Sequence, residues 1–267
     1  MTDFVFIDSG LGGIPYMASL LQRSPQSKCI YIGDTANFPY GEKTHEQVIS
    51  CVTSLVEKIC EKFSPSVIVL ACNTMSVNAL EAVRSKFPEV KFVGTVPAIK
   101  LAASLSKNRR IGLLATHATC ENPYNLELKN NFASDCTLIN RADPELISYI
   151  EHYGFTASRK ECLKAVTPAV DFFRKENCDV IILGCTHFLN FTDIFEEACD
   201  SSIKVVDSVD GVVRHALEIR GFGEEAAAPA DKQNSPSLYV TGFTDENEKM
   251  QYKELCLKFG ILFKGIF

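Results

Sequence analysis

The stretch VIVLACNTMS at residues 67–76 decides the fold. Its first half is a run of β-branched and aliphatic residues, which is typical of a strand buried on both faces of a parallel sheet. The run ends at Cys72, and Asn73 and Thr74 follow at once. A buried strand therefore brings a thiol, an amide and a hydroxyl to the point where it stops.

Residues 180–189, VIILGCTHFL, repeat this pattern with Cys185, Thr186 and His187. Each cysteine comes directly before a stretch with helical spacing of apolar residues. In open parallel sheets, ligands bind beyond the carboxyl ends of the strands, and helix amino termini there lower thiol pKa values and hold carboxylates. Both thiols are therefore predicted to lie where a ligand would bind.

Strand-like runs recur along the chain, and most are followed by a turn signal and a helical pattern, which predicts βα units and a parallel sheet. The runs cover residues 4–8, 29–34, 67–72, 91–96, 110–116, 136–140, 179–185 and 204–209. Matched residues of the two halves keep a spacing that changes once, from 107 to 113 residues. The matched pairs are Ile7 with Leu114, Ile32 with Ile139, Cys72 with Cys185 and Val93 with Val206. This predicts a duplicated domain with one insertion.

The part of the chain after about residue 212 lies outside the repeat. It contains a helical stretch, a linker rich in Gly, Ala, Pro and Ser at 223–236, a strand-like run at 237–243 and a helix at 245–259 that stops at Gly260. We interpret the linker as a surface insertion. A chain that leaves one domain, builds a second and returns would end in this way.

The predicted fold is therefore α/β, with two pseudo-symmetric domains, each a parallel flavodoxin-like sheet flanked by helices, and the active site in the cleft between them. The first domain comprises residues 1–96 and 212–267, and the second comprises residues 97–211.

The composition describes a soluble globular protein: 46% of the 267 residues are hydrophobic, 22% are charged and the net charge is −6. No apolar run approaches the roughly 18 residues of a membrane span, and no basic run suggests nucleic acid or an anionic membrane as a partner. The amino terminus, MTDFVFIDSG, lacks a basic signal-peptide region, which favours a cytoplasmic location.

The 11 cysteines do not suggest disulfides or a zinc site, because their number is odd and no C-x-x-C pair is present. The remaining histidines show no ligand-like grouping with carboxylates, and no phosphate-binding glycine motif occurs, so neither a metal nor a nucleotide cofactor is predicted.

A single cysteine at the end of a buried strand is more often a packing residue than a catalytic one. Two of them with polar neighbours favour chemistry, and Asp8 and Ser9 end the adjacent strand in the same way. If the halves face each other, the thiols would flank one ligand. Two thiols on opposite faces of one carbon suit the removal of a proton from one side and its return from the other.

Six motifs together resemble the glutamate racemase family, in the order of that family and over nearly the whole chain. They are DSGLGG at 8–13, GDTANFPYG at 33–41, ACNTMSVNAL at 71–80, GTVPAIK at 94–100, ATHAT at 115–119 and GCTH at 184–187. The resemblance implies a racemase that interconverts L- and D-glutamate without a cofactor and supplies D-glutamate for peptidoglycan. It also makes a homodimer one option for the assembly, with no dimer face indicated.

The resemblance implies roles for individual residues. Cys72 would be the base for D-glutamate, assisted by Asp8, and Cys185 the base for L-glutamate, assisted by His187 and Glu151. The residues implied to bind substrate are Asp8, Ser9, Tyr40, Gly41, Asn73, Thr74, Thr116, Thr119, Thr186 and His187.

The sequence departs from the usual family pattern near these motifs. Phe188 and Leu189 follow GCTH where Tyr-Pro is usual, Met75 follows ACNT where Ala is usual, and Asn122 replaces a common Ser. No catalytic group is deleted, so the departures bear on specificity and rate rather than on the reaction.

Three other functions remain open from the sequence. A related racemase for aspartate or a hydantoin would keep both cysteines. A thiol hydrolase would use Cys185 as nucleophile and His187 as its base, but it leaves Cys72 unexplained. A two-lobed binding protein would carry inert cysteines.

Overall fold

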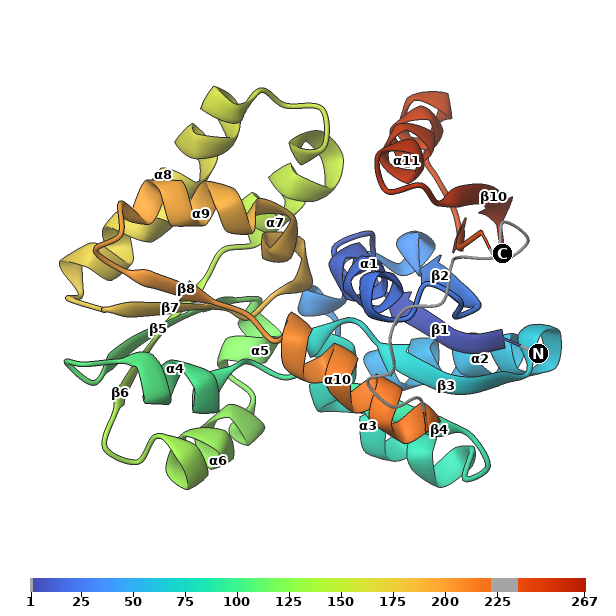
Figure 1. Ribbon diagram of the computed structural model, residues 1–267, viewed down its shortest axis with the longest axis horizontal. Helices are drawn as coiled ribbons and strands as arrows, with labels where there is room; N and C mark the ends of the chain where they lie inside the picture. Colours follow the sequence, from blue (N-terminus) through green and yellow to red (C-terminus); the bar gives the residue numbers. More distant parts are fainter. Residues whose placement is uncertain (1, 222–234) are drawn as a thin grey trace. The chain divides into compact units, whose positions relative to one another are not determined.

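The computed structural model describes residues 2–221 and 235–267, and the chain forms two compact units (Figure 1). Unit 1 contains the residues up to Thr95 together with Val209–Phe267, and unit 2 contains Val96–Ser208. Most of the linker predicted at 223–236 lies outside the described residues. Within the described ranges, no helix is both long enough and apolar enough to cross a membrane.

Unit 1 is built on a six-stranded parallel sheet with the order β10-β9-β2-β1-β3-β4. Its strands are β1 (Thr2–Asp8), β2 (Cys29–Gly33), β3 (Pro65–Leu70), β4 (Lys91–Gly94), β9 (Ser237–Val240) and β10 (Leu262–Ile266). Its helices are α1 (Ile14–Arg23), the 3₁₀ turns η1 (Thr35–Asn37) and η2 (Tyr40–Glu42), α2 (His45–Phe63), α3 (Asn73–Lys86), α10 (Val209–Arg220) and α11 (Glu246–Lys258). One core forms where alternate side chains of the central strands pack against α2 and α3.

Unit 2 is built on a four-stranded parallel sheet with the order β6-β5-β7-β8. Its strands are β5 (Arg110–Ala115), β6 (Thr137–Ala142), β7 (Val180–Leu183) and β8 (Lys204–Val206). Its helices are α4 (Ile99–Leu105), α5 (His117–Cys120), α6 (Pro123–Phe132), α7 (Pro144–Tyr149), the π-helix η3 (Ile150–Gly154), α8 (Arg159–Lys175), the 3₁₀ turn η4 (Thr186–Phe191) and α9 (Thr192–Cys199). Figure 1 shows α8 and α9 on one face of this sheet and α4 and α6 on the other.

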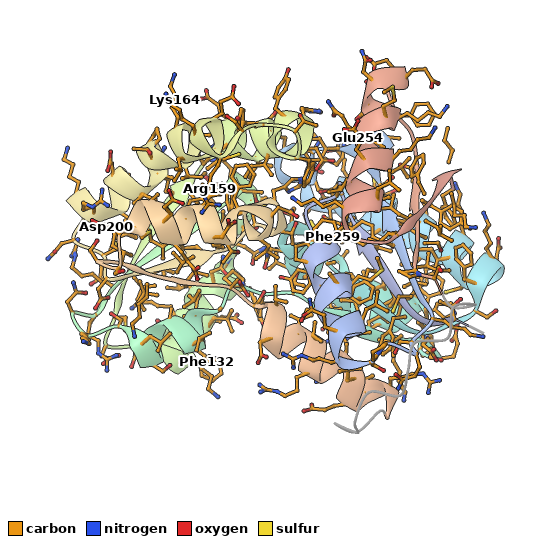
Figure 2. All side chains as sticks on the ribbon, turned by 45° about the horizontal axis from the view of Figure 1, so that its top comes forward. Phe132, Arg159, Lys164, Asp200, Glu254 and Phe259 are labelled. Carbon is orange, nitrogen blue, oxygen red and sulfur yellow. The ribbon has the colours of Figure 1, made fainter. Side chains whose placement is uncertain are left out.

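Helices α8 and α9 are linked at their surface by Arg159. Figure 2 labels Arg159. Its guanidinium lies 2.7 Å from Asp193 and 2.8 Å from Glu197. These groups are about half exposed, so the pairs contribute little to stability, on the order of 1 kcal/mol or less. Helix α9 also buries Phe195 and Ile194, and burial of a large apolar side chain contributes more, about 1.5–3 kcal/mol each.

The strand order of unit 2 repeats that of β2-β1-β3-β4 in unit 1, so the predicted parallel flavodoxin-like sheet is present in both halves. Ile7 pairs with Leu70 as Leu114 pairs with Leu183, which places Cys72 and Cys185 at equivalent positions.

One matched pair from the sequence is wrong. Ile7 pairs with Ile32, whereas Leu114 pairs with Arg141, so the counterpart of Ile32 is Arg141 and not Ile139. The spacing therefore changes twice, from 107 to 109 and then to 113 residues. Ile139 is the counterpart of Ile30, and it also fits the position of Ile32 in the sequence pattern, because strand periodicity repeats every two residues.

Two helices do not belong to the same unit as the strand that precedes them in the chain. Helix α4 follows β4 in the chain but contacts β7 and β8, and α10 follows β8 but contacts β3 and β4. The exchange is reciprocal, because β3 is equivalent to β7 and β4 to β8. The chain therefore passes from unit 1 to unit 2 near Thr95, before α4, and returns to unit 1 near Ser208, before α10.

The tail returns to the first sheet, where β9 pairs with β2. The sequence analysis did not predict β10, which follows Gly260 and, among the described strands, pairs with β9 alone at the sheet edge. Leu262 and Ile266 are about half exposed there, so the run lacks the buried alternation that marks the other strands.

Candidate active site

Cys72 lies between β3 and α3, at the carboxyl edge of the first sheet, and is 6% exposed. The amide of Ala71 still donates to the carbonyl of Ile7 in β1, so Cys72 is the first residue after the hydrogen bonds between β1 and β3 end. Ser76, which the sequence analysis missed, supports this point: its hydroxyl lies 2.9 Å from the Cys72 carbonyl and accepts from the Thr95 amide.

Asp8 ends the adjacent strand β1 and is fully buried. Its Oδ1 accepts from the Ser9 amide at 2.6 Å, and its Oδ2 accepts from the Gly13 amide at 2.7 Å and from the Tyr31 hydroxyl at 3.1 Å. The Gly13 amide precedes α1, so the carboxylate also lies at the positive end of a helix. The Ser9 hydroxyl is 3.4 Å from Asp8 Oδ1 and 3.9 Å from Cys72 Sγ. Ser9 thus lies between the carboxylate and the thiol.

Gly13 and Tyr31 were missed by the sequence analysis. A Cβ at Gly13 would come within 2.5 Å of the Ala71 carbonyl oxygen and 3.0 Å of Asp8 Oδ2, so only glycine allows this close approach. Tyr31 carried a signal, because a buried tyrosine needs a partner for its hydroxyl and its strand position faces the same side as Asp8.

Tyr40 and Gly41 lie in η2, in the loop that follows β2. Tyr40 is 1% exposed, belongs to the same core cluster as Cys72 and donates to Asp34. Burial, together with the negative charge of Asp34, raises the pKa of Tyr40 far above its usual range. Tyr40 therefore stays protonated, and it presents its ring near the thiol.

Asn73 and Thr74 form the first turn of α3 and are 4% and 2% exposed. Among the described residues, no group donates to Asn73 Oδ1. A buried carbonyl oxygen without a donor costs about 1–3 kcal/mol, so this atom is prepared to accept a hydrogen bond from a ligand.

Cys185 lies at the equivalent edge of the second sheet and is also 6% exposed. Its sulfur is 3.6 Å from His187 Nδ1, and His187 Nε2 is 2.8 Å from Glu151 Oε2. His187 and Glu151 are 2% and 4% exposed. The structure thus brings together the thiol, imidazole and carboxylate that the resemblance implied.

Two short helical turns place the carboxylate of Glu151 and the imidazole of His187 next to the Cys185 thiol. Glu151 lies in the π-helix η3, a form that often marks functional sites, and His187 lies in the 3₁₀ turn η4. A Cβ at Gly154 would come within 2.9 Å of the Phe191 ring, so the two turns pack in direct contact. Nothing in the sequence pattern indicated a π-helix.

Burial alone would lower the pKa of His187, but hydrogen bonds to Cys185 and Glu151 and the negative charges of both groups outweigh it and raise the pKa well above its usual value. The ring is therefore protonated at neutral pH, and each nitrogen donates a hydrogen bond. An imidazolium N–H directed at the Cys185 sulfur stabilises negative charge there.

The predicted threonines lie at the same carboxyl edge of unit 2. Thr116 follows β5 and accepts from the Thr119 amide, and its hydroxyl lies 3.0 Å from that of Thr119. Thr186 follows Cys185 directly and is 1% exposed. Thr116 is the counterpart of Ser9, whereas the counterpart of Asp8 is Ala115. The two cysteines thus have different acid–base partners on equivalent scaffolds.

The departures from the family pattern are packing residues or, in one case, a helix cap. Met75 and Phe188 are fully buried, and the Phe188 ring meets the Phe195 ring edge to face at 5.9 Å. Asn122 caps α6 by accepting from the Tyr124 amide, which a serine could also do. No described group of three or more His, Cys, Asp or Glu side chains has the arrangement of a metal site.

The chain thus repeats one parallel sheet, with a thiol at the carboxyl edge of each copy. A family model described as Asp/Glu/Hydantoin racemase matches residues 13–216, so the chain belongs to this family and is an amino-acid racemase.

Similar relatives within the family are glutamate racemases. The chain is 36% identical to the glutamate racemase of Treponema pallidum over 98% of this chain and 95% of the relative. It is 33% identical to that of Shewanella oneidensis over 89% and 86%. The solved structure of Escherichia coli glutamate racemase, with L-glutamate and the activator UDP-MurNAc-ala, has a TM-score of 0.84 at 27% identity and covers 100% of this chain and 98% of that one.

Proposed function

We propose that the protein interconverts L- and D-glutamate without a cofactor, by proton transfer at the α-carbon between two thiols. Cys185 removes the α-proton of L-glutamate, and Cys72 delivers a proton to the opposite face. The reverse reaction exchanges the roles. Each turnover leaves one thiolate and one thiol, so atoms and charges balance.

The observation that carries the proposal is the different environment of two equivalent cysteines. Cys72 has Ser9 and Asp8 beside it, and Cys185 has His187 and Glu151. A duplication kept only for packing would have no reason to supply each thiol with its own acid–base group. Two thiols that act on opposite faces of the α-carbon each need an acid–base group of their own.

Substrate binding would use the residues that the resemblance implied at both edges. The α-ammonium of glutamate is a donor suited to Asn73 Oδ1, and the positive amino-terminal end of α3 suits a carboxylate. The neutral, buried hydroxyls of Tyr40, Thr119 and Thr186 can complete the hydrogen bonds. The related Escherichia coli enzyme was solved with L-glutamate, which supports this choice of substrate.

The proposed role is the supply of D-glutamate for peptidoglycan in the cytoplasm, and a homodimer is a compatible assembly. The proposal needs no nucleic-acid or membrane partner.

The test is to incubate the purified protein, without pyridoxal phosphate, with each enantiomer of glutamate and of aspartate and to follow optical activity. We expect both glutamate enantiomers to reach the racemic mixture and aspartate to react at least about 100-fold more slowly, since a side chain shortened by one methylene misplaces its carboxylate. Faster conversion of aspartate would identify another specificity within the family. A stable acyl-enzyme on Cys185 would favour a hydrolase.

A further inference from the structure

The residues that follow β9 hold the loop that carries Tyr40. The Thr241 hydroxyl donates to Asp34 Oδ1 at 2.8 Å and accepts from the Ala36 amide at 3.0 Å. The neighbouring Gly242 exchanges two hydrogen bonds with the Thr35 hydroxyl. The tail, more than 200 residues further along the chain, is thus tied to this loop by side-chain contacts beyond the β2–β9 ladder.

Asp34 transmits this contact to Tyr40. Its carboxylate is 2% exposed and accepts from Thr241, from Asn37 Nδ2 at 3.0 and 3.1 Å and from the Tyr40 hydroxyl. Thr241 therefore fixes one carboxylate oxygen, and Tyr40 binds the other. A buried carboxylate held by several donors has one orientation, and the Tyr40 ring takes its position from it.

The second half of the molecule shows what the tail adds. The counterpart of Asp34 is Asp143, because the amide of each donates to the end of the equivalent central strand. Asp143 is satisfied locally, by the Leu146 amide and by Arg141. It therefore needs no additional segment, whereas Asp34 accepts a hydrogen bond from the hydroxyl of Thr241, the residue that follows β9.

We propose that Thr241 is a positioning residue for the substrate site: through Asp34 it holds Tyr40 and Gly41 in place beside Cys72. The inference deepens the proposed function and rests on it. The tail of the chain then does more than complete the sheet of unit 1, since it sets the geometry of a substrate-binding loop.

The test compares Thr241→Val with Thr241→Ser. Valine keeps the shape and removes the hydroxyl, so we expect KM for glutamate to rise by about 10-fold with kcat changed by less than about 3-fold, the signature of lost ground-state binding. Serine keeps the hydroxyl and should restore KM to within about 2-fold of wild type. Because the equilibrium constant between enantiomers is unity, kcat/KM must fall equally in both directions.

Thr244→Val is the matched control. The Thr244 hydroxyl is exposed and donates to the Glu248 side chain at the start of α11, within the tail itself. It should leave KM unchanged. If Thr241→Val does not fold, Thr241→Ala removes the same hydroxyl without a branched replacement. In a Tyr40→Phe background, Thr241→Val should have a clearly smaller effect, since the two act through one carboxylate.

An active wild type with an unchanged KM in the folded Thr241→Val variant would overturn the inference and leave the proposed function intact. Equal, additive effects in both backgrounds would also overturn it. A wild type that does not racemise glutamate would reject the proposed function itself, and this inference with it.

Discussion

Replacement of either Cys72 or Cys185 by serine is expected to lower kcat for both glutamate enantiomers by about 10²–10⁴-fold, the usual contribution of a positioned acid or base. Each direction needs one cysteine as base and the other as acid, so a single substitution removes one partner from both directions. A serine hydroxyl is far less acidic than a thiol and cannot take either role at neutral pH. Optical activity measured with each enantiomer gives the two rates.

Two buried cysteines serve as matched controls. Cys29 begins β2 and Cys178 precedes β7, so both lie at the amino edges of the same sheets and are 3% and 5% exposed. Burial raises the pKa of Cys178 to about 11, so it remains a thiol at neutral pH. Serine at either control position should leave kcat within about 3-fold of wild type, as for substitutions away from the chemistry. Racemisation at the wild-type rate by Cys72→Ser or Cys185→Ser would exclude two-thiol chemistry.

Glu151→Gln is expected to have the next largest effect, a fall in kcat of about 10–100-fold, because His187 loses the carboxylate that keeps it protonated. Without the hydrogen bond and the charge of Glu151, the pKa of His187 falls, because burial still lowers it, and less of the ring is imidazolium beside Cys185 at neutral pH. Loss of the Glu151 charge beside the buried His187 should also reduce the free energy of unfolding at neutral pH by about 3 kcal/mol, the low end for a broken buried pair.

The pH dependence of stability gives a second measure of this pair. The folded-state pKa of His187 is raised above the unfolded value, so its contribution is fully present below about pH 6.5 and is lost as pH rises through the folded pKa. Between the unfolded and the folded pKa of His187, the folded state binds up to one more proton than the unfolded state. The unfolding free energy of the wild type should therefore fall by up to about 1.4 kcal/mol per pH unit from this group. Glu151→Gln should flatten this slope in denaturant titrations at several pH values.

Glu218→Gln is the control for Glu151→Gln. Glu218 lies 3.7 Å from His215, but both side chains are more than half exposed. Its removal should change neither kcat nor the slope of stability with pH. A slope that is the same in wild type and Glu151→Gln would show that His187 is not held protonated by Glu151.

The two thiols could be predicted from sequence because a buried strand has a strong pattern and its end is easy to see. Cys72 and Cys185 stop two such runs, and polar residues follow both. The pairing of Cys185 with His187 was also local, since the two are neighbours in the chain. The position of Glu151 came only from the family resemblance, because it depends on a π-helix that no periodicity marks.

The residues that the sequence did not reveal act over long separations in the chain. Tyr31 binds Asp8 from the neighbouring strand, and Thr241 binds Asp34 from the tail. A single hydroxyl in a strand gives no sign of its partner until the strand order is known. The register of β6 failed for a related reason, since a two-residue shift preserves the apolar alternation that was used to match it.

Isotope transfer in D₂O tests the central claim most directly. Protiated L-glutamate is converted by the wild type, the reaction is stopped early, and the α-position of each separated enantiomer is examined by mass spectrometry. Two-base transfer predicts that all newly formed D-glutamate carries deuterium, because the donating thiol exchanged with solvent beforehand, while the remaining L-glutamate keeps its protium. D-Glutamate that retains protium would show that one group both removes and returns the proton, and would contradict transfer between Cys185 and Cys72.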